Sequence, residues 1–239
     1  MAKKTPIEHL QFLQRTKQNI ATAIAILFHV IGLIGILFTP YKDWFIQNTS
    51  LNLCLMAVLL IWNQPQKNIS FFGFVTVVFI TGMLTEVIGI NTGRLFGNYT
   101  YGTVLGIKFR GVPWLVGLNW FVVIFCSGTC MIKLQQWFKR KFEKEEQELS
   151  PRMAAVSLII DGALLATFFD WVMEPVAVKL GFWQWQNSVV PFYNYLCWFI
   201  ISAILLLVYR WFTFNKDNHF AVHLFIIQTL FFLALRTYL

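Results

Sequence analysis

Four acidic residues lie inside apolar stretches that are long enough to cross a membrane: Glu86, Asp161, Asp170 and Glu174. Placing an ionisable group at the centre of a bilayer costs roughly 2.5–3.5 kcal/mol on insertion scales, so such residues usually face a protein interior and have a function. Asp170 and Glu174 are four residues apart and share one helix face. Asp161 is roughly half a turn out of phase with Asp170, so we expect it to point elsewhere and to make a structural hydrogen bond between helices. Glu86, Asp170 and Glu174 are therefore the candidate catalytic residues.

Three carboxyl groups of this kind are suited to acid catalysis. A carboxyl group in an apolar cavity, beside a second carboxylate, can hold a proton near neutral pH. It can then protonate a weak base while its neighbour stabilises the resulting cation, and tryptophan and tyrosine faces favour a cation through the ring quadrupole. The structural alternative is an ion pair between Glu86 or Asp170 and a basic residue near a helix end, such as Arg94 or Lys179.

Polar and aromatic residues accompany these carboxyl groups. Four asparagines are candidates for positioning a water molecule, although an asparagine alone is more often a structural hydrogen-bonding residue: Asn91, Asn98, Asn119 and Asn194. Tyr99 and Tyr101, like Trp183 and Trp185, alternate with a period of two, which is typical of an extended segment. These aromatic pairs either close the cavity at the membrane interface or anchor the chain in the aromatic belt.

Several other chemistries are disfavoured by what the sequence lacks. Four histidines are too few for the histidine-rich site of a membrane di-iron oxygenase, and we interpret His219 and His223 as structural. The four cysteines all fall in apolar stretches and indicate neither a disulfide framework nor a metal knuckle. No GxGxxG follows a strand, no DDxxD pair is present, and the last apolar stretch has no lysine for a Schiff base. We therefore expect no metal and no cofactor.

The composition indicates an integral membrane protein. Apolar residues make up 57% of 239 positions and charged residues only 13%, roughly half the share that is usual in a soluble domain. A membrane helix needs about 20 apolar residues, so about seven spans account for the apolar total. We predict an all-α integral membrane fold with a single transmembrane domain over residues 1–239. The expected spans are 20–38, 45–62, 71–91, 112–132, 153–179, 191–212 and 219–238, and polar residues dilute the start of the second.

The net charge of +8 predicts topology rather than nucleic-acid binding, because the basic residues lie at the ends of spans. With the N-terminus in the cytoplasm, 13 of the 19 basic residues fall on the cytoplasmic side. The positive-inside rule therefore predicts a multi-pass protein of the inner (plasma) membrane with a cytoplasmic N-terminus and an external C-terminus. Residues 133–152 form the expected cytoplasmic linker, and the mixed charges at 139–148 favour a solvated helix there.

An internal duplication relates residues 71–122 to residues 155–200. EVIGINTGRLFGNYTY at 86–101 matches DWVMEPVAVKLGFWQW at 170–185 with a shift of 84, and VPWLVGLNWFV at 112–122 matches VPFYNYLCWFI at 190–200. The matched positions are Glu86 with Asp170, Gly97 with Gly181, Tyr99 with Trp183, Tyr101 with Trp185, Pro113 with Pro191 and Trp120 with Trp198. Both units begin on the cytoplasmic side, so we predict two parallel repeats around one shared cavity, with the first matched pair at equivalent depths.

These motifs resemble a known family. The strings TEVIGINTGRLFGNYTYG, GVPWLVGLNW, DWVMEPVAVKLGFW and PFYNYLCWF are similar to the membrane carotenoid-biosynthesis family that contains the carotenoid 1,2-hydratases, of the bisanhydrobacterioruberin hydratase and γ-carotene 1′-hydratase type. The resemblance covers about residues 71–212. The family is also similar in pattern to the heterodimeric lycopene cyclases.

The resemblance implies addition of water across the terminal C1=C2 double bond of an acyclic (ψ) carotenoid end, giving a tertiary alcohol. The implied substrate is lycopene, γ-carotene or a longer acyclic carotenoid, met in the lipid bilayer; other carotenoid enzymes or a second copy of the chain are further candidate partners. Glu86, Asp170 or Glu174 then protonates C2, and the faces of Trp114 and Trp171 shield the cation at C1. Tyr101 and the four asparagines complete the expected substrate site.

Two other functions fit the same residues. A lycopene-type cyclase begins with the same acid attack but quenches the cation with an internal double bond instead of water. A proton-coupled transporter or carrier is the non-enzymatic alternative, because parallel repeats around carboxylates in the middle of the membrane also suit transport.

Overall fold

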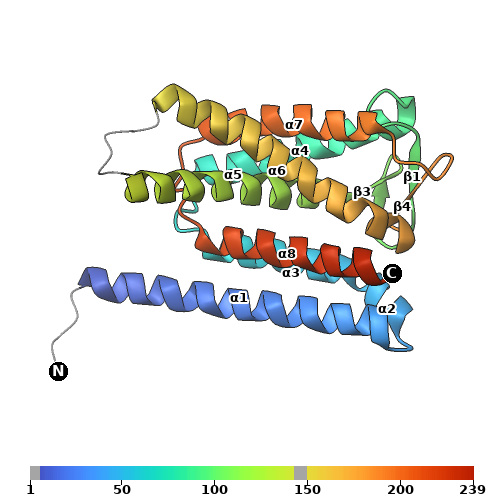
Figure 1. The fold of residues 1–239 in the computed structure, drawn as a ribbon, viewed down its shortest axis with the longest axis horizontal. Coiled ribbons are helices and arrows are strands. Elements are labelled where there is room, and N and C mark those ends of the chain that lie inside the picture. Colours follow the sequence, from blue (N-terminus) through green and yellow to red (C-terminus); the bar gives the residue numbers. More distant parts are fainter. Residues whose placement is uncertain (1–5, 143–149) are drawn as a thin grey trace.

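The computed structural model describes residues 6–142 and 150–239, which form a bundle of α-helices with two small two-stranded sheets at one end (Figure 1). The helices are α1 (Pro6–Phe38), α2 (Lys42–Gln47), α3 (Thr49–Asn63), α4 (Ile69–Thr92), α5 (Trp114–Phe142), α6 (Pro151–Lys179), α7 (Phe192–Trp211) and α8 (His219–Tyr238). The strands are β1 (Tyr99–Tyr101), β2 (Lys108–Phe109), β3 (Val112–Pro113) and β4 (Trp183–Trp185). The expected all-α membrane fold is confirmed.

Among the described residues, six helices are long and apolar enough to cross a membrane: α1, α4, α5, α6, α7 and α8. The second expected span, residues 45–62, is instead divided between α2 and α3 at Asn48, whose side-chain amide donates to the carbonyl oxygen of Trp44 over 2.8 Å. The 15 residues of α3 reach only about 22 Å at 1.5 Å per residue, less than a bilayer core of about 30 Å. The segment is therefore a shorter, interrupted helix.

The expected cytoplasmic linker is partly described. Helix α5 continues to Phe142, and α6 begins after Ser150, whose hydroxyl caps the helix by accepting from the backbone N–H of Met153 over 3.2 Å. The rest of the charged run, residues 143–149, lies outside the described residues. Pro175 lies inside α6, which continues through it to Lys179, so the helix is not interrupted beside Glu174.

The two aromatic segments that alternate with a period of two pair with each other. Strands β1 and β4 are antiparallel, with Tyr99 opposite Trp185 and Tyr101 opposite Trp183. Because β1 follows α4 and β4 follows α6, the C-terminal ends of both helices meet at the same end of the bundle (Figure 1). The two matched units thus run in the same direction, as parallel repeats would.

A second contact joins the matched units inside the bundle. The indole rings of Trp120 on α5 and Trp198 on α7 stack with their centroids 3.9 Å apart and their planes 11° apart. Both side chains are buried. Gly82 on α4 leaves room for this stack, because a Cβ atom there would lie 2.6 Å from Cγ of Trp120. Residues at matched sequence positions therefore meet face to face.

Helices α1, α3 and α8 complete the bundle on one side. In Figure 1, α1 lies below α8 and α3, and the group formed by α4, α5, α6 and α7 lies above them. Helix α8 packs against α1, α5 and α6. This arrangement places α8 between the first helix and the two matched units.

We predict that Gly102→Ala destabilises the protein by about 1–3 kcal/mol, the usual cost of overpacking. Gly102 follows β1, and its backbone N–H donates to the carbonyl oxygen of Phe182 over 2.8 Å. A Cβ atom at residue 102 would lie 2.0 Å from the carbonyl oxygen of Gly181, so the strands must separate. Thermal unfolding of the purified protein in detergent measures the effect. Gly32→Ala is the control, since its methyl group would meet Phe231 at an ordinary 3.7 Å; equal melting of both variants would contradict the prediction.

Candidate active site

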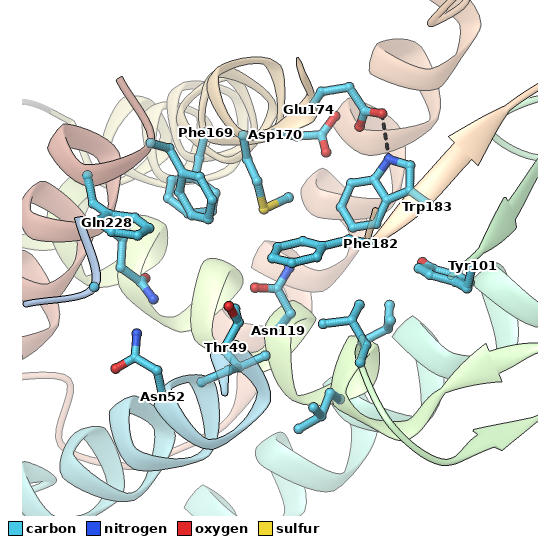
Figure 2. A pocket seen from close by; sticks show the side chains of 18 of the residues that line it. Thr49, Asn52, Tyr101, Asn119, Phe169, Asp170, Glu174, Phe182, Trp183 and Gln228 are labelled. Carbon is cyan, nitrogen blue, oxygen red and sulfur yellow. Dashed lines mark hydrogen bonds between the residues drawn. The ribbon is translucent and has the colours of Figure 1, made fainter. Parts of the chain in front are cut away.

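A cavity of about 620 Å³ lies inside the bundle, and all three candidate catalytic carboxyl groups line it. Its wall is built from all eight described helices, α1 to α8, and from the strands β1 and β4. Most of the lining is aromatic or aliphatic, and the polar groups project into it from several helices (Figure 2). The cavity thus combines an apolar binding space with a few polar groups, which is typical of small-molecule sites.

The carboxyl group of Glu86, on α4, is buried and accepts three hydrogen bonds. The phenol of Tyr101 donates to Oε2 over 2.8 Å, the phenol of Tyr99 donates to the same oxygen, and the indole N–H of Trp120 donates to Oε1 over 3.1 Å. Burial and the neighbouring Glu86 carboxylate raise the pKa of both phenols well above its usual range. The two phenols therefore remain protonated, and both act as hydrogen-bond donors to Glu86.

The carboxyl group of Glu174, on α6, is held in a similar way by the other strand. The indole N–H of Trp183 donates to Oε1 over 2.6 Å, and the indole N–H of Trp185 donates to the same oxygen. An indole N–H can only donate, so this oxygen is fixed as an acceptor. Figure 2 shows Trp183 and Glu174 facing each other at one end of the cavity.

Asp170 differs from the other two carboxyl groups in having a fully buried oxygen atom without a hydrogen-bond partner among the described residues. The side-chain amide of Asn194, on α7, donates to Oδ2 over 3.0 Å. The other oxygen, Oδ1, is buried and has no hydrogen-bond partner among the described residues. Only 1% of Asp170 is exposed. Because most buried polar atoms are hydrogen-bonded, an unpaired carboxyl oxygen beside a cavity is available to a ligand or to carry a proton.

The repeat predicts Asp170 as the counterpart of Glu86, but the aromatic strands show a different correspondence. Tyr99 and Tyr101 donate to Glu86, whereas Trp183 and Trp185 donate to Glu174 rather than to Asp170. Glu174 lies one helical turn nearer to β4 along α6, so its carboxyl group meets the indole N–H groups. Asp170 is left as the carboxyl group outside this pattern.

Two expectations about buried charge can now be settled. Within the described residues, no ion pair involves Glu86 or Asp170, so the alternative with Arg94 or Lys179 is wrong. Asp161 is exposed and points away from the cavity, as expected. Its hydrogen bond, however, comes from Ser157 of the same helix over 2.6 Å, so the expected bond to another helix is wrong.

Three of the predicted substrate-binding residues line the cavity, namely Tyr101, Asn119 and Asn194. Four others do not: Asn91, Asn98, Trp114 and Trp171. Asn91 is exposed and donates to the carbonyl oxygens of Val87 and Arg110 over 2.8 and 3.2 Å. Asn98 is also exposed. The expectation that these two asparagines position a water in the cavity is therefore wrong.

The two tryptophans that were expected to shield a cation lie on the outer surface. Trp114 begins α5 and is 48% exposed, and Trp171 on α6 is 44% exposed. The guanidinium of Arg236 lies 4.0 Å from the ring centroid of Trp171. Trp171 directly follows Asp170 and is turned about 100° from it around the helix. The tryptophans that do line the cavity are Trp44, Trp183, Trp185 and Trp198.

Sequence reasoning did not assign several residues of the site. Trp120 holds Glu86, and Asn52 and Gln228 line the cavity from α3 and α8. Trp120 carried one signal, its match with Trp198 in the repeat. Nothing in the sequence pointed to Asn52 or Gln228, because a single amide in an apolar stretch usually has a structural role.

The histidine pair near the start of α8 makes structural contacts. His219 Nε2 lies 2.9 Å from Nζ of Lys133 and 3.4 Å from Oδ1 of Asp217, and His223 Nδ1 lies 2.8 Å from the hydroxyl of Thr22. The described residues include no cluster of three histidine, cysteine or acidic side chains that is suited to a metal ion. The absence of a metal and of a cofactor stays a prediction.

The chain is similar to known proteins of carotenoid biosynthesis. The sequence profile of a family described as carotenoid biosynthesis protein matches residues 47–238. Over 128 residues, or 52% of the chain, the sequence is 26% identical to a bisanhydrobacterioruberin hydratase from Haloarcula japonica. The aligned part covers 39% of that protein's length. No solved structure matches the chain.

Proposed function

The chain belongs to the family of carotenoid biosynthesis proteins, and on this premise we propose that it adds water to the terminal C1=C2 double bond of an acyclic carotenoid end group. The observation that carries the proposal is the convergence of Glu86, Asp170 and Glu174 on one apolar cavity. The relative from Haloarcula japonica, which is named as a hydratase, supports the same reaction. The product is a tertiary alcohol.

Asp170 is the proton donor in this proposal. Both oxygens of Glu86 and Oε1 of Glu174 already accept hydrogen bonds from fixed donors. Asp170 Oδ1, in contrast, has no partner among the described residues. Several carboxylates in one buried cavity repel one another, so a state in which one of them is protonated is favoured. The unpaired oxygen is the one that can carry this proton to a substrate.

The reaction needs one proton transfer in each direction. The Asp170 carboxyl donates its proton to C2, the π electrons of the double bond form the new C–H bond, and C1 becomes a tertiary cation. A water oxygen then forms the C–O bond at C1, and the resulting oxonium ion returns a proton to the Asp170 carboxylate. The sum is alkene plus water giving alcohol, with the protein unchanged.

Glu86 and Glu174 stabilise the cation without moving. Each is held by donors on a rigid strand or helix, so its negative charge is already in place when the cation forms. Such preorganised charge in a water-poor site is a large contribution to catalysis. The cavity also presents the aromatic rings of Trp183, Trp185 and Trp198, whose faces attract a cation.

The substrate reaches this site from the bilayer in our proposal. Most of the cavity lining is apolar, which suits a hydrocarbon end group. The charge distribution predicts a plasma-membrane protein with a cytoplasmic N-terminus, which puts the carboxyl groups and the strands toward the opposite side. Protease protection of tagged termini in membrane vesicles tests this orientation.

Expression in a host that accumulates lycopene or γ-carotene tests the function directly. We expect a new pigment that is heavier by one water and keeps the chromophore of its precursor, because C1=C2 is not conjugated with the polyene. Liquid chromatography with mass spectrometry and absorption detection identifies it. An isomer of unchanged mass that absorbs at shorter wavelength would replace the hydratase with a cyclase. Unchanged pigments from both substrates would remove the enzymatic assignment and favour transport.

A further inference from the structure

Three amide side chains project into the cavity away from the strand pair that holds Glu86 and Glu174. They are Asn52 on α3, Asn119 on α5 and Gln228 on α8. Figure 2 shows Asn52 and Gln228 on facing walls, and Asn119 between them and the carboxyl groups. The mechanism described above uses none of the three. They form what we call the amide site, namely Asn52, Asn119 and Gln228.

The amide site has unused hydrogen-bonding capacity. Oδ1 of Asn52 is buried and has no hydrogen-bond partner in the part of the chain that the structure describes. Neither Asn119 nor Gln228 makes a side-chain hydrogen bond with another described residue, although Gln228 is only 8% exposed. An asparagine of the same cavity behaves differently, since Asn194 donates to Asp170 over 3.0 Å. Buried amide groups without partners are unfavourable, and Gln228 and Oδ1 of Asn52 are in this position, so the site calls for an occupant with hydrogen-bonding groups.

The surroundings of the amide site define the chemistry of that occupant. The neighbouring cavity walls on α6 and α8 are Phe169, Phe231 and Phe232, which offer no hydrogen bonds. Among the described residues that line the cavity, the acidic ones are the three carboxyl groups already placed and no lysine or arginine occurs, so the amide site lacks a partner for an ion. Each amide group both donates and accepts. A small neutral molecule that also does both fits the site, and a carotenoid hydrocarbon does not.

We infer that the amide site holds the water molecule that attacks the cation. This inference rests on the proposed hydration and names the site of its second substrate. A buried water needs two to four polar partners, and the amide site offers unpaired donors and acceptors in the same cavity as the apolar walls that suit the carotenoid. His29, which also lines this region, has Nδ1 bound to the carbonyl oxygen of Ala25 over 2.7 Å. Its ring orientation is therefore fixed, with Nε2 available to the same water.

Removal of the water site separates protonation from hydration. When the cation at C1 forms and no water attacks, a neighbouring carbon loses a proton to the Asp170 carboxylate and the double bond returns. If the donated proton was a deuteron, part of the recovered carotenoid keeps deuterium on carbon. A variant that still protonates the substrate but cannot add water therefore leaves deuterium in the recovered carotenoid. A general structural defect would not produce this deuterium.

Gln228→Met is the main test, since methionine has nearly the shape of glutamine but no amide. Membranes that contain the protein are incubated with preformed unlabelled lycopene in D2O buffer, and the pigments are analysed by mass spectrometry. We expect at least about a tenfold loss of hydrate per protein, the effect of one lost hydrogen bond of about 1.4 kcal/mol. The recovered lycopene should still gain deuterium. Asn52→Leu should behave in the same way, and Gln228→Asn, which keeps the amide, should retain more hydrate.

Thr229→Val is the matched control on α8. It also removes a polar group, but the Thr229 hydroxyl donates to the carbonyl oxygen of Phe225 within the helix over 2.8 Å and does not line the cavity. Its hydrate yield should equal that of the unchanged chain.

Hydrate yields equal to that of the unchanged chain in both Gln228→Met and Asn52→Leu would overturn the inference. So would parallel loss of hydrate and deuterium at unchanged membrane content, because water capture would then not be the affected step. Lycopene carries no oxygen, so a lost contact to a carotenoid hydroxyl group cannot produce the expected result. If the unchanged chain forms no hydrate, the proposed function fails instead.

Discussion

Asp170→Asn should lower hydrate formation from lycopene by about 10²–10⁴-fold, the usual contribution of a general acid. Asparagine keeps the shape of the side chain and can still contact Asn194, but it has no proton of suitable acidity to give to C2. Asp170 is singled out among the three carboxyl groups because one of its oxygen atoms is fully buried and has no hydrogen-bond partner among the described residues. Initial rates in membranes, divided by the protein content from an immunoblot, measure the effect.

The same helix provides a matched control for this substitution. Asp161→Asn makes the identical chemical change on α6, but the Asp161 carboxyl is exposed and accepts its hydrogen bond from Ser157 of the same helix. Its activity should be unchanged. Because Asp170 starts the reaction, Asp170→Asn should also abolish deuterium uptake into recovered lycopene in D2O, unlike the variants of the amide site. Retention of that uptake in Asp170→Asn would assign the proton donor to another carboxyl group.

The membrane helices were predictable because their signal is local. Helix α8 spans the expected residues 219–238, and α4 exceeds the expected 71–91 by only a few residues. In both cases a continuous apolar run ends at polar residues, and length alone distinguishes it from other elements. The prediction of one continuous span over residues 45–62 was wrong because of polar residues that are visible in the sequence. Asn48 and its polar neighbours interrupt the apolar run, and the helix breaks at Asn48.

The candidate site was only partly predictable, because the rotation of each helix decides which side chains meet. The three carboxyl groups could be found, since a charge in a membrane helix requires an interior. Trp171 could have been excluded, because it is turned about 100° from Asp170. Strands β1 and β4 belong to segments that the repeat matches with a shift of 84 positions, but the packing of whole helices decides that these segments pair. Gln228 and Asn52 lie outside the region of resemblance and show their relation to the site only once α3 and α8 are packed.

The second large effect is expected from Glu86→Gln, which should slow hydration by about 10²–10³-fold, the range found when one preorganised electrostatic group is removed. The glutamine has the same shape but no negative charge to oppose the cation at C1. Its new NH2 group must also face either the phenols of Tyr99 and Tyr101 or the indole N–H of Trp120, all of which donate. With the NH2 group toward Tyr99 and Tyr101, the two phenols must turn from donors into acceptors to keep their contacts, so the main loss in this variant is the charge.

Two further variants separate charge from packing at Glu86. Tyr101→Phe removes one donor and leaves the carboxylate, so its loss should be only about tenfold, the effect of one hydrogen bond. Thr85→Val, on the adjacent position of α4, removes a hydroxyl that donates only within the helix, over 3.0 Å to Thr81 and Gly82, and should leave the rate unchanged. Single-turnover rates in membranes, with lycopene in excess over its half-saturating concentration, measure the chemical step apart from binding. Equal losses in Glu86→Gln and Tyr101→Phe would show that the position of the side chain, rather than its charge, is what hydration requires, because the phenylalanine variant keeps the carboxylate and the glutamine variant does not.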